Sequence, residues 1–148
     1  MKEHSLEVLE FKKIIGMTAQ RAATKIGKEI IENLEPVNNS NYIKERLAEV
    51  SSLKSMIGEF STPPFGGVRD IRDDLKKAAK GSVLSTDAIS RVRSTLRGVS
   101  ELQRYLESIE SDLDPRIIER EYQIIYDLCS DLQSRPGLAR EIDRCIDE

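Results

Sequence analysis

Three pairs of carboxylates lie close enough in the sequence to act together: Asp73 with Asp74, Asp112 with Asp114, and Asp127 with Asp131. Paired carboxylates can work as general acid and base, or they can bind a divalent cation. The first two pairs lie at expected helix starts or turns, where capping of free backbone N–H groups explains them. The third pair has no histidine partner and no third ligand nearby, so we expect a solvated helix face there.

Two cysteines and one histidine complete the side chains with catalytic potential. Cys129 and Cys145 are sixteen residues apart, without a second cysteine pair or a nearby histidine, so the spacing of zinc ligands is absent. We expect both to be reduced core thiols on apolar helix faces. His4 belongs to an N-terminus that we expect to be frayed. With no Ser/His/Asp set and no nucleotide-binding loop, the sequence predicts no catalytic site in these residues.

Positive charge is unevenly distributed along the chain. Residues 69–104 contain nine Lys or Arg against five Asp or Glu, whereas residues 105–148 contain five against twelve. Arg93 and Arg97 are four residues apart, so they share a helix face from which they could bind phosphate oxygens. The alternative is a set of solvated helix faces, with the arginine stems lying over the edge of the core. The net charge of −3 is not typical of a dedicated nucleic-acid-binding domain.

One stretch, residues 63–71, interrupts the helical pattern in the middle of the chain. Pro63 and Pro64 restrict φ and remove two N–H donors, so no helix can run through them. Gly66 and Gly67 allow a positive φ or the close approach of another segment. Asp70 offers its carboxylate to the following N–H groups and is the expected N-cap of a new helix. The sequence therefore predicts a rigid loop that forms a fixed corner between two helical halves.

Apolar residues recur at three- and four-residue steps through most of the chain, which is typical of helices that bury one face. We expect Gly16 to end the first helix and Gly27 to mark a place where another helix crosses. Apolar stripes run from Ile43 to Phe60 and, longest of all, from Ile89 to Ile109. The pattern predicts an all-α fold, an irregular bundle of six to seven helices over residues 5–16, 18–34, 41–60, 70–80, 85–109, 115–132 and 138–146.

Length and composition fit one helical domain over residues 1–148. The chain is 39% hydrophobic and 33% charged, which is typical of a folded protein. No apolar run approaches the roughly 20 residues that cross a bilayer, and the first residues lack the apolar core of a signal peptide. We therefore expect a cytoplasmic protein without a membrane partner.

The loop and the segments around it carry a family resemblance. The residues concerned are Pro64 to Ile71, Leu75, Ala78-Ala79, Gly81 and Val83-Leu84, with Leu9 to Ile14 and Lys25 to Glu29 upstream and Leu138, Ile142 and Cys145 to Glu148 downstream. Together they resemble the N-terminal core and lever segment of the type-two bacterial MutS proteins. The resemblance covers nearly the whole chain and includes no catalytic signature. A Phe-x-Glu mismatch-reading motif is absent, because Phe11 precedes two lysines and Phe60 precedes Ser61-Thr62.

The resemblance implies a non-catalytic part of a larger, dimeric protein. Such proteins join a helical core and lever to a clamp, a P-loop ATPase and often an Smr endonuclease, so ATP and Mg²⁺ are implied for the parent protein and no cofactor for this segment. They are implicated in suppressing recombination at branched DNA and in rescuing stalled, collided ribosomes. Under this hypothesis the structural corner consists of Pro63, Pro64, Gly66, Gly67 and Asp70, and the contacts to nucleic acid or the ribosome are Arg69, Arg72, Lys76, Lys77, Arg93 and Arg97.

A competing interpretation is a stand-alone helical interaction module that dimerises through the stripe from Ile89 to Ile109. It needs neither ATP nor nucleic acid, because packing alone explains the periodicity and the mixed charge. Against it, the last residues, Cys145 to Glu148, form no polar tail and lie where the family would continue. The sequence therefore favours a part of a longer protein.

Overall fold

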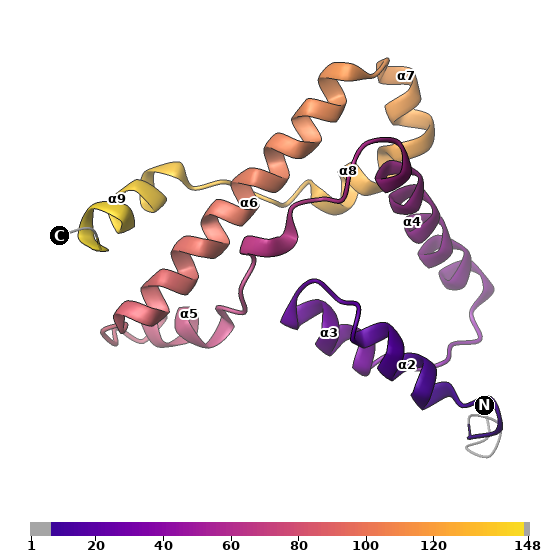
Figure 1. Cartoon of the computed structure of the whole chain (residues 1–148), viewed down its shortest axis with the longest axis horizontal. Coiled ribbons are helices and arrows are strands. Elements are labelled where there is room, and N and C mark those ends of the chain that lie inside the picture. Colours follow the sequence, from indigo (N-terminus) through magenta and orange to yellow (C-terminus); the bar gives the residue numbers. More distant parts are fainter. Residues whose placement is uncertain (1–6, 147–148) are drawn as a thin grey trace.

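Capping side chains set the helix starts in the structure, a computed structural model that describes residues 7–146 (Figure 1). The Asn39 side chain accepts the N–H groups of residues 41 and 42, and the Ser85 hydroxyl accepts that of Ala88. Asp114 accepts the N–H of Arg116 at 2.8 Å, directly before a helix that begins with Pro115. The starts at Ser85 and Asp114 confirm the predicted caps, and α4 begins at Ser40, one residue before the predicted Asn41. Each cap satisfies N–H groups that have no partner within the helix.

The all-α prediction is confirmed, with no strand anywhere in residues 7–146. If the continuous stretch from α7 through η2 to α8 is taken as one helix, this range holds seven helices and a short 3₁₀ turn. In chain order the elements are α2 (Phe11–Ala19), α3 (Lys25–Glu32), α4 (Ser40–Glu59), η1 (Phe65–Gly67), α5 (Arg72–Ala79), α6 (Thr86–Asp112), α7 (Pro115–Ile117), η2 (Ile118–Tyr122), α8 (Gln123–Cys129) and α9 (Pro136–Ile146).

The two N-terminal helices differ from the prediction. Helix α2 runs through Gly16, because one glycine costs a helix only about 1 kcal/mol. Helix α3 begins at Lys25, where the Thr24 hydroxyl accepts the N–H of Gly27 at 3.0 Å. Gly27 therefore belongs to a capped first turn, and no other helix crosses there: the nearest atoms to an added Cβ come from Thr24 and Ala22. The expected start at residues 5–6 lies outside the described residues.

The main core lies where α4, α6 and the η2–α8 stretch meet. Met56, Leu106, Ile109, Tyr122 and Ile125 are buried together there. Tyr122 is fully buried, and its hydroxyl donates to a Glu59 carboxylate oxygen at 2.8 Å. Burial and the neighbouring Glu59 raise the pKa of Tyr122 to about 12, so this hydroxyl stays a donor at neutral pH. The stripe from Ile89 to Ile109 thus buries its C-terminal half inside one chain.

The η2 stretch, Ile118–Tyr122, is a π-helical turn. Its wider turn places both Ile118 and Tyr122 in buried positions. The Ser52 hydroxyl of α4 donates to the backbone carbonyl of Glu121, so the widened turn is tied to α4. This contact and the Tyr122–Glu59 bond fix the angle at which α4 meets the helix after Pro115.

The predicted corner loop crosses α6 at backbone contact distance. A Cβ added to Gly67 would lie 3.1 Å from Gly98 Cα and 3.1 Å from the Ser94 carbonyl oxygen. The Ser94 hydroxyl donates to the Gly67 carbonyl at 2.8 Å, and the Arg69 N–H donates to the Thr95 hydroxyl at 3.0 Å. Gly66 has no atom within 4 Å of an added Cβ, so only Gly67 is required for the close approach. Neither glycine has a positive φ.

Helix α5 starts at Arg72 with Ile71 as its N-cap, one residue later than the predicted cap at Asp70 implies. Ile71 stands at the cap position, while the Asp70 carboxylate accepts the Arg72 N–H at 3.3 Å, as in an Asx turn. At the other end Gly81 has φ +76°, its N–H donates to the Ala78 carbonyl, and the Ser82 N–H donates to the Lys77 carbonyl. This Schellman arrangement satisfies the last carbonyls and sets the turn toward α6.

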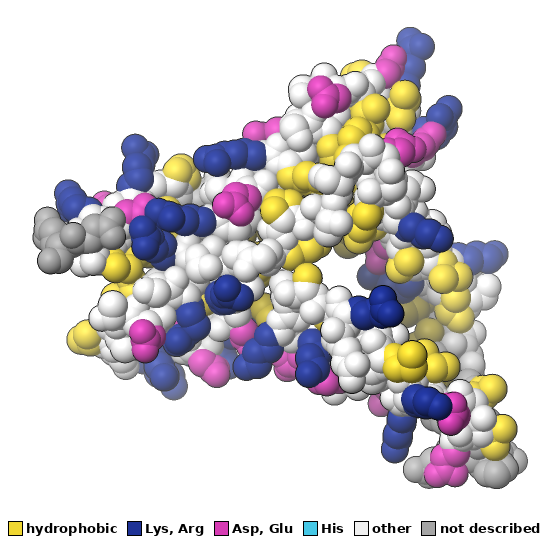
Figure 2. All heavy atoms as spheres, viewed as in Figure 1, with side chains coloured by type: hydrophobic (Ala, Val, Ile, Leu, Met, Phe, Trp, Pro, Cys, Tyr) yellow, Lys and Arg dark blue, Asp and Glu magenta, His cyan; other side chains and the backbone are white. Residues whose placement is uncertain are grey.

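Part of the expected apolar stripe of α4 is not buried. Met56 faces the core and Leu53 and Phe60 pack against it, but Leu47 and Val50 remain 60% and 65% exposed. Figure 2 shows hydrophobic side chains at the surface over α4 and the α2–α3 pair. The difference arises because the core residues of α4 lie toward its C-terminal end. No described helix is long and apolar enough to cross a membrane.

The Gly67–Gly98 crossing can be tested by adding one methyl group. We expect Gly67→Ala to destabilise the fold by about 1–3 kcal/mol, because its Cβ would press on backbone atoms that cannot rotate away. Urea unfolding followed by circular dichroism measures the change. Gly66→Ala is the matched control and should change the free energy of unfolding by less than about 1 kcal/mol. Equal effects of the two substitutions would contradict the crossing.

Candidate nucleic-acid interface

Helix α5 is held on α6 by a buried carboxylate. Asp74 is only 5% exposed, and both of its oxygens accept from Arg91, at 2.9 Å from Nε and 2.8 Å from Nη2. The bidentate bond from Arg91 outweighs the desolvation of Asp74 and lowers the pKa of this carboxyl. Of the candidate acid pair Asp73 and Asp74, one member is therefore committed to an ion pair, and the other is exposed.

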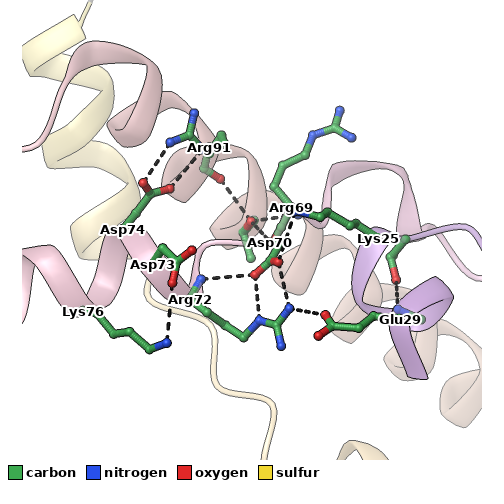
Figure 3. A network of polar contacts seen from close by, with 12 residues as sticks. Lys25, Glu29, Arg69, Asp70, Arg72, Asp73, Asp74, Lys76 and Arg91 are labelled. Atoms are coloured by element: carbon green, nitrogen blue, oxygen red, sulfur yellow. Dashed lines mark hydrogen bonds and ion pairs between the residues drawn. The ribbon is translucent and has the colours of Figure 1, made fainter. Parts of the chain in front are cut away.

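A second network joins the corner loop, α5 and α3 (Figure 3). Arg72 donates from Nε and Nη2 to the two Asp70 oxygens, each at 2.8 Å, and Nη2 also donates to Glu29 of α3. Lys25 Nζ lies 3.8 Å from Asp70. The hydrogen bond from the Arg72 side chain holds the pKa of Asp70 well below its usual range. Arg72 thus links α3 to the rest of the molecule and is already neutralised by two carboxylates.

A third group connects α6 with α9. Arg93 Nε and Arg97 Nη2 each donate to one oxygen of Asp143, the second at 3.0 Å. The hydrogen bonds from Arg97 and Arg93 lower the pKa of Asp143, so it is charged at neutral pH. A hollow of about 270 Å³ lies beside the two arginines and is lined by Gly67, Ser90, Arg93, Ser94, Arg97, Gly98 and Glu101.

The six cations predicted to contact nucleic acid divide into two groups. Four of them, Arg72, Lys76, Arg93 and Arg97, have carboxylate partners within the chain. Arg69 and Lys77 are exposed and form no ion pair with any described residue. In Figure 3 the Arg69 side chain extends away from the Asp70 network. Figure 2 shows Lys and Arg side chains along the edge over α5, with acidic side chains between them.

The remaining candidates for chemistry do not form a site within residues 7–146. No group of three His, Cys, Asp or Glu in this range could hold a metal ion. Asp127 accepts a hydrogen bond from Gln123 at 2.7 Å. Cys129 is partly buried beside the core, where burial raises the pKa of its thiol, but Cys145 is exposed, so the prediction of two core thiols is wrong for Cys145. Helix α9 buries none of its residues, which leaves Cys145 at the surface.

The acidic partners of the arginines could not be recognised from the sequence. Asp74 looked like a helix-start residue, and Asp143 had no recognisable role. The Arg97–Asp143 pair spans 46 residues and the Arg91–Asp74 pair spans 17, so no local spacing rule could have found either pair. The positive charge of residues 69–104 was visible in the sequence, but its neutralisation was not.

The chain matches no protein-family model. It is similar along its length to proteins named endonuclease MutS2. The relative from Halothermothrix orenii is 49% identical over 148 residues, all of this chain and 19% of that protein. The relative from Clostridium botulinum strain 657 is 31% identical over 147 residues, 99% of this chain and 18% of that protein. The one from Acetivibrio thermocellus is 35% identical over 121 residues, 80% of this chain and 15% of that protein. The chain spans about a fifth of the length of the first two relatives, and the predicted resemblance is confirmed.

The Asp74–Arg91 pair predicts a pH dependence of stability. A carboxyl whose pKa is lowered by folding stabilises the fold while it is ionised. This contribution is present above the ordinary pKa of about 4 and is lost as the pH falls through the lower folded value. We expect Asp74→Asn to make the fall of the urea midpoint between about pH 5 and pH 2 shallower than in the wild type.

The matched control for this experiment is Asp73→Asn. Asp73 lies in the same turn and is exposed, and within residues 7–146 its ion-pair partner is Lys76 at 3.5 Å. We expect its pH profile to follow that of the wild type. The same loss of pH dependence in both variants would contradict a special role for Asp74.

Proposed function

Because the chain belongs by sequence to the type-two MutS family, we propose that it is a non-catalytic core and lever segment of a longer, DNA-acting protein. The observation that carries this proposal is the 49% identity over all 148 residues to a protein of which they make up only 19%. The proposal treats residues 1–148 as a single helical domain. Its role is mechanical and positional, and the chemistry belongs to other parts of the protein.

The packing of α6 suits a lever. The helix has 27 residues and is therefore about 40 Å long. Along its length it is held by the Asp74–Arg91 pair, by the backbone crossing at Gly98, and by the core around Leu106 and Ile109. Closely packed contacts resist compression, so a displacement at one end of such a helix is passed to the other.

The partners of the longer protein follow from the family. We infer that it is a homodimer that binds ATP and Mg²⁺ at a P-loop outside residues 1–148, carries an Smr endonuclease, and works in the cytoplasm. Its substrates would be branched DNA, where it suppresses recombination, or stalled, collided ribosomes with their RNA. A movement driven by ATP at a distant dimer interface would reach a clamp around the nucleic acid through this segment.

Contacts to phosphate are best supported at Arg69 and Lys77. Both are exposed, and neither forms an ion pair with a described residue, so neither has to leave a protein partner to bind a phosphate. Arg72 is held by two carboxylates and serves the structure. Lys76 lies between these cases, since its one ion-pair partner among the described residues is the exposed Asp73.

The stand-alone dimerisation module loses its main support. Its proposed dimer surface was the stripe from Ile89 to Ile109, and Leu102, Leu106 and Ile109 of that stripe are buried within one chain. The native reading frame distinguishes a segment of a longer ATPase from a stand-alone interaction module. A G-x-x-x-x-G-K-[ST] loop after codon 148 supports the ATPase proposal, and a stop codon at that point contradicts it.

The phosphate contacts predict a loss of DNA binding. We expect the double substitution Arg69→Glu and Lys77→Glu to weaken binding of a labelled four-way junction at low salt by on the order of tenfold. The slope of log affinity against log salt should decrease by about 2, one for each lost phosphate contact. Fluorescence anisotropy at several salt concentrations measures both quantities.

The matched control makes the same change of charge on α4, with Lys44→Glu and Lys54→Glu. Both lysines are exposed and form no ion pair among the described residues. We expect this variant to bind nearly as well as the wild type. An equal loss in the two double variants would mean that net charge alone governs binding, which would remove Arg69 and Lys77 as contacts.

A further inference from the structure

Two arginines of α6 converge on a single carboxylate. Arg93 and Arg97 stand one helical turn apart, and each donates to a different oxygen of Asp143 on α9. Glu101 is four residues after Arg97, within reach on the same helix face although in the less favourable base-before-acid order, and it forms no ion pair with either arginine. The geometry therefore selects an acid from another helix over a local one.

Such an arrangement has the chemistry of a phosphate site. A guanidinium presents a planar fork of N–H groups that fits the oxygens of a carboxylate or of a phosphate in the same way. We propose that Arg93 and Arg97 form a phosphate-binding site whose ligand position is taken here by Asp143, and that a nucleic-acid phosphate competes with α9 for it. This inference rests on the proposed nucleic-acid function and names a further site for it.

The surroundings of the two arginines have room for such a ligand. The adjacent hollow of about 270 Å³ is lined by the side chains of Ser90 and Ser94 and by the Gly67–Gly98 crossing. Ser94 already donates to the Gly67 carbonyl, which leaves the Ser90 hydroxyl as the additional donor. Among the charged lining residues, Arg93 and Arg97 outweigh Glu101, so the hollow carries a charge of +1 without Asp143 and 0 with it.

Helix α9 is attached in a way that permits competition. None of its residues is buried, and the helix that it packs against is α6. The segment before α9 is anchored separately, by Gln103 Nε2 donating to the Leu132 carbonyl at 2.7 Å. The Arg97 side chain is 55% exposed and that of Asp143 29%, so water and salt reach the Arg97–Asp143 pair and weaken it, while Arg93 is 25% exposed and better shielded. Release of Asp143 therefore need not disturb the main core.

The test uses the 148-residue chain and a labelled DNA duplex at low salt. We expect Asp143→Asn to bind the duplex on the order of fivefold more tightly than the wild type, because both guanidiniums become available. Adding Arg93→Gln and Arg97→Gln to that variant should return the affinity to the wild-type value or below it. Asp131→Asn is the matched control, since it removes one exposed negative charge that has no ion pair among the described residues.

Three outcomes overturn the inference. They are an unchanged affinity for Asp143→Asn, equal tightening by Asp131→Asn, and tightening that survives loss of the two arginines. If wild-type binding nevertheless depends on Arg69 and Lys77, the proposed nucleic-acid function stands and only this site is wrong.

A second measurement does not depend on removing Asp143. Amide hydrogen exchange of α9 in the wild type should speed up when the duplex is added, and it should not respond to the duplex in the Arg93→Gln and Arg97→Gln chain. Exchange in α9 that is unaffected by DNA in the wild type also overturns the proposal.

Discussion

The arrangement of the second half of the molecule depends on the contact between two glycines. Gly67 in the corner loop and Gly98 in α6 touch through backbone atoms, with a Cβ at either position meeting atoms at 3.1 Å. This contact fixes where the loop crosses α6. It therefore also fixes the position in space of the end of α4 and of the start of α5 relative to α6. The hydrogen bonds from Ser94 and Thr95 then orient the loop, and α5 is brought beside Arg91.

Four of the nine cations in residues 69–104 join separate elements of the fold. Arg91 binds the buried Asp74, Arg72 connects Asp70 with Glu29, and Arg93 and Arg97 bind Asp143. The three groups differ in burial, and burial decides how much each ion pair contributes to the stability of the fold. The bidentate pair at Asp74 is structural because the carboxylate itself is buried, whereas the Asp143 side chain is 29% exposed and its Arg97 partner 55%, so solvent screens that side of the group. A basic segment therefore cannot be equated with a phosphate-binding surface residue by residue.

The packing around Tyr122 fixes how the C-terminal end of α6 lies against α4 and α8. A π-helical turn widens the helix after Pro115, and Tyr122 enters the core with its hydroxyl on Glu59. Phe60 meets the same ring edge-on at a centroid distance of 6.2 Å. Helix α4 is thereby fixed against α8 near its C-terminal end, and its N-terminal apolar residues stay exposed. The described segment therefore has packed joints at both ends of the 27-residue α6, an arrangement that suits the proposed lever.

Local patterns in the sequence were enough to predict the all-α class, a helix start near Asn41, the helix starts at Ser85 and Asp114, the break at Pro63-Pro64, and the resemblance to the type-two MutS proteins. These features depend on local chemistry: capping, the fixed φ of proline, and apolar periodicity are properties of a few neighbouring residues. Local signals failed at the boundary between the first two helices. Gly16 was expected to end one helix and Thr18 to start the next, but α2 continues to Ala19 and the cap of α3 is Thr24. Which glycine of the Gly66-Gly67 pair makes the close contact depended on how the loop packs on α6. The tertiary structure also decided which cysteine is exposed and which arginines already have a partner, because these outcomes depend on residues that lie 17 to 50 positions apart in the chain.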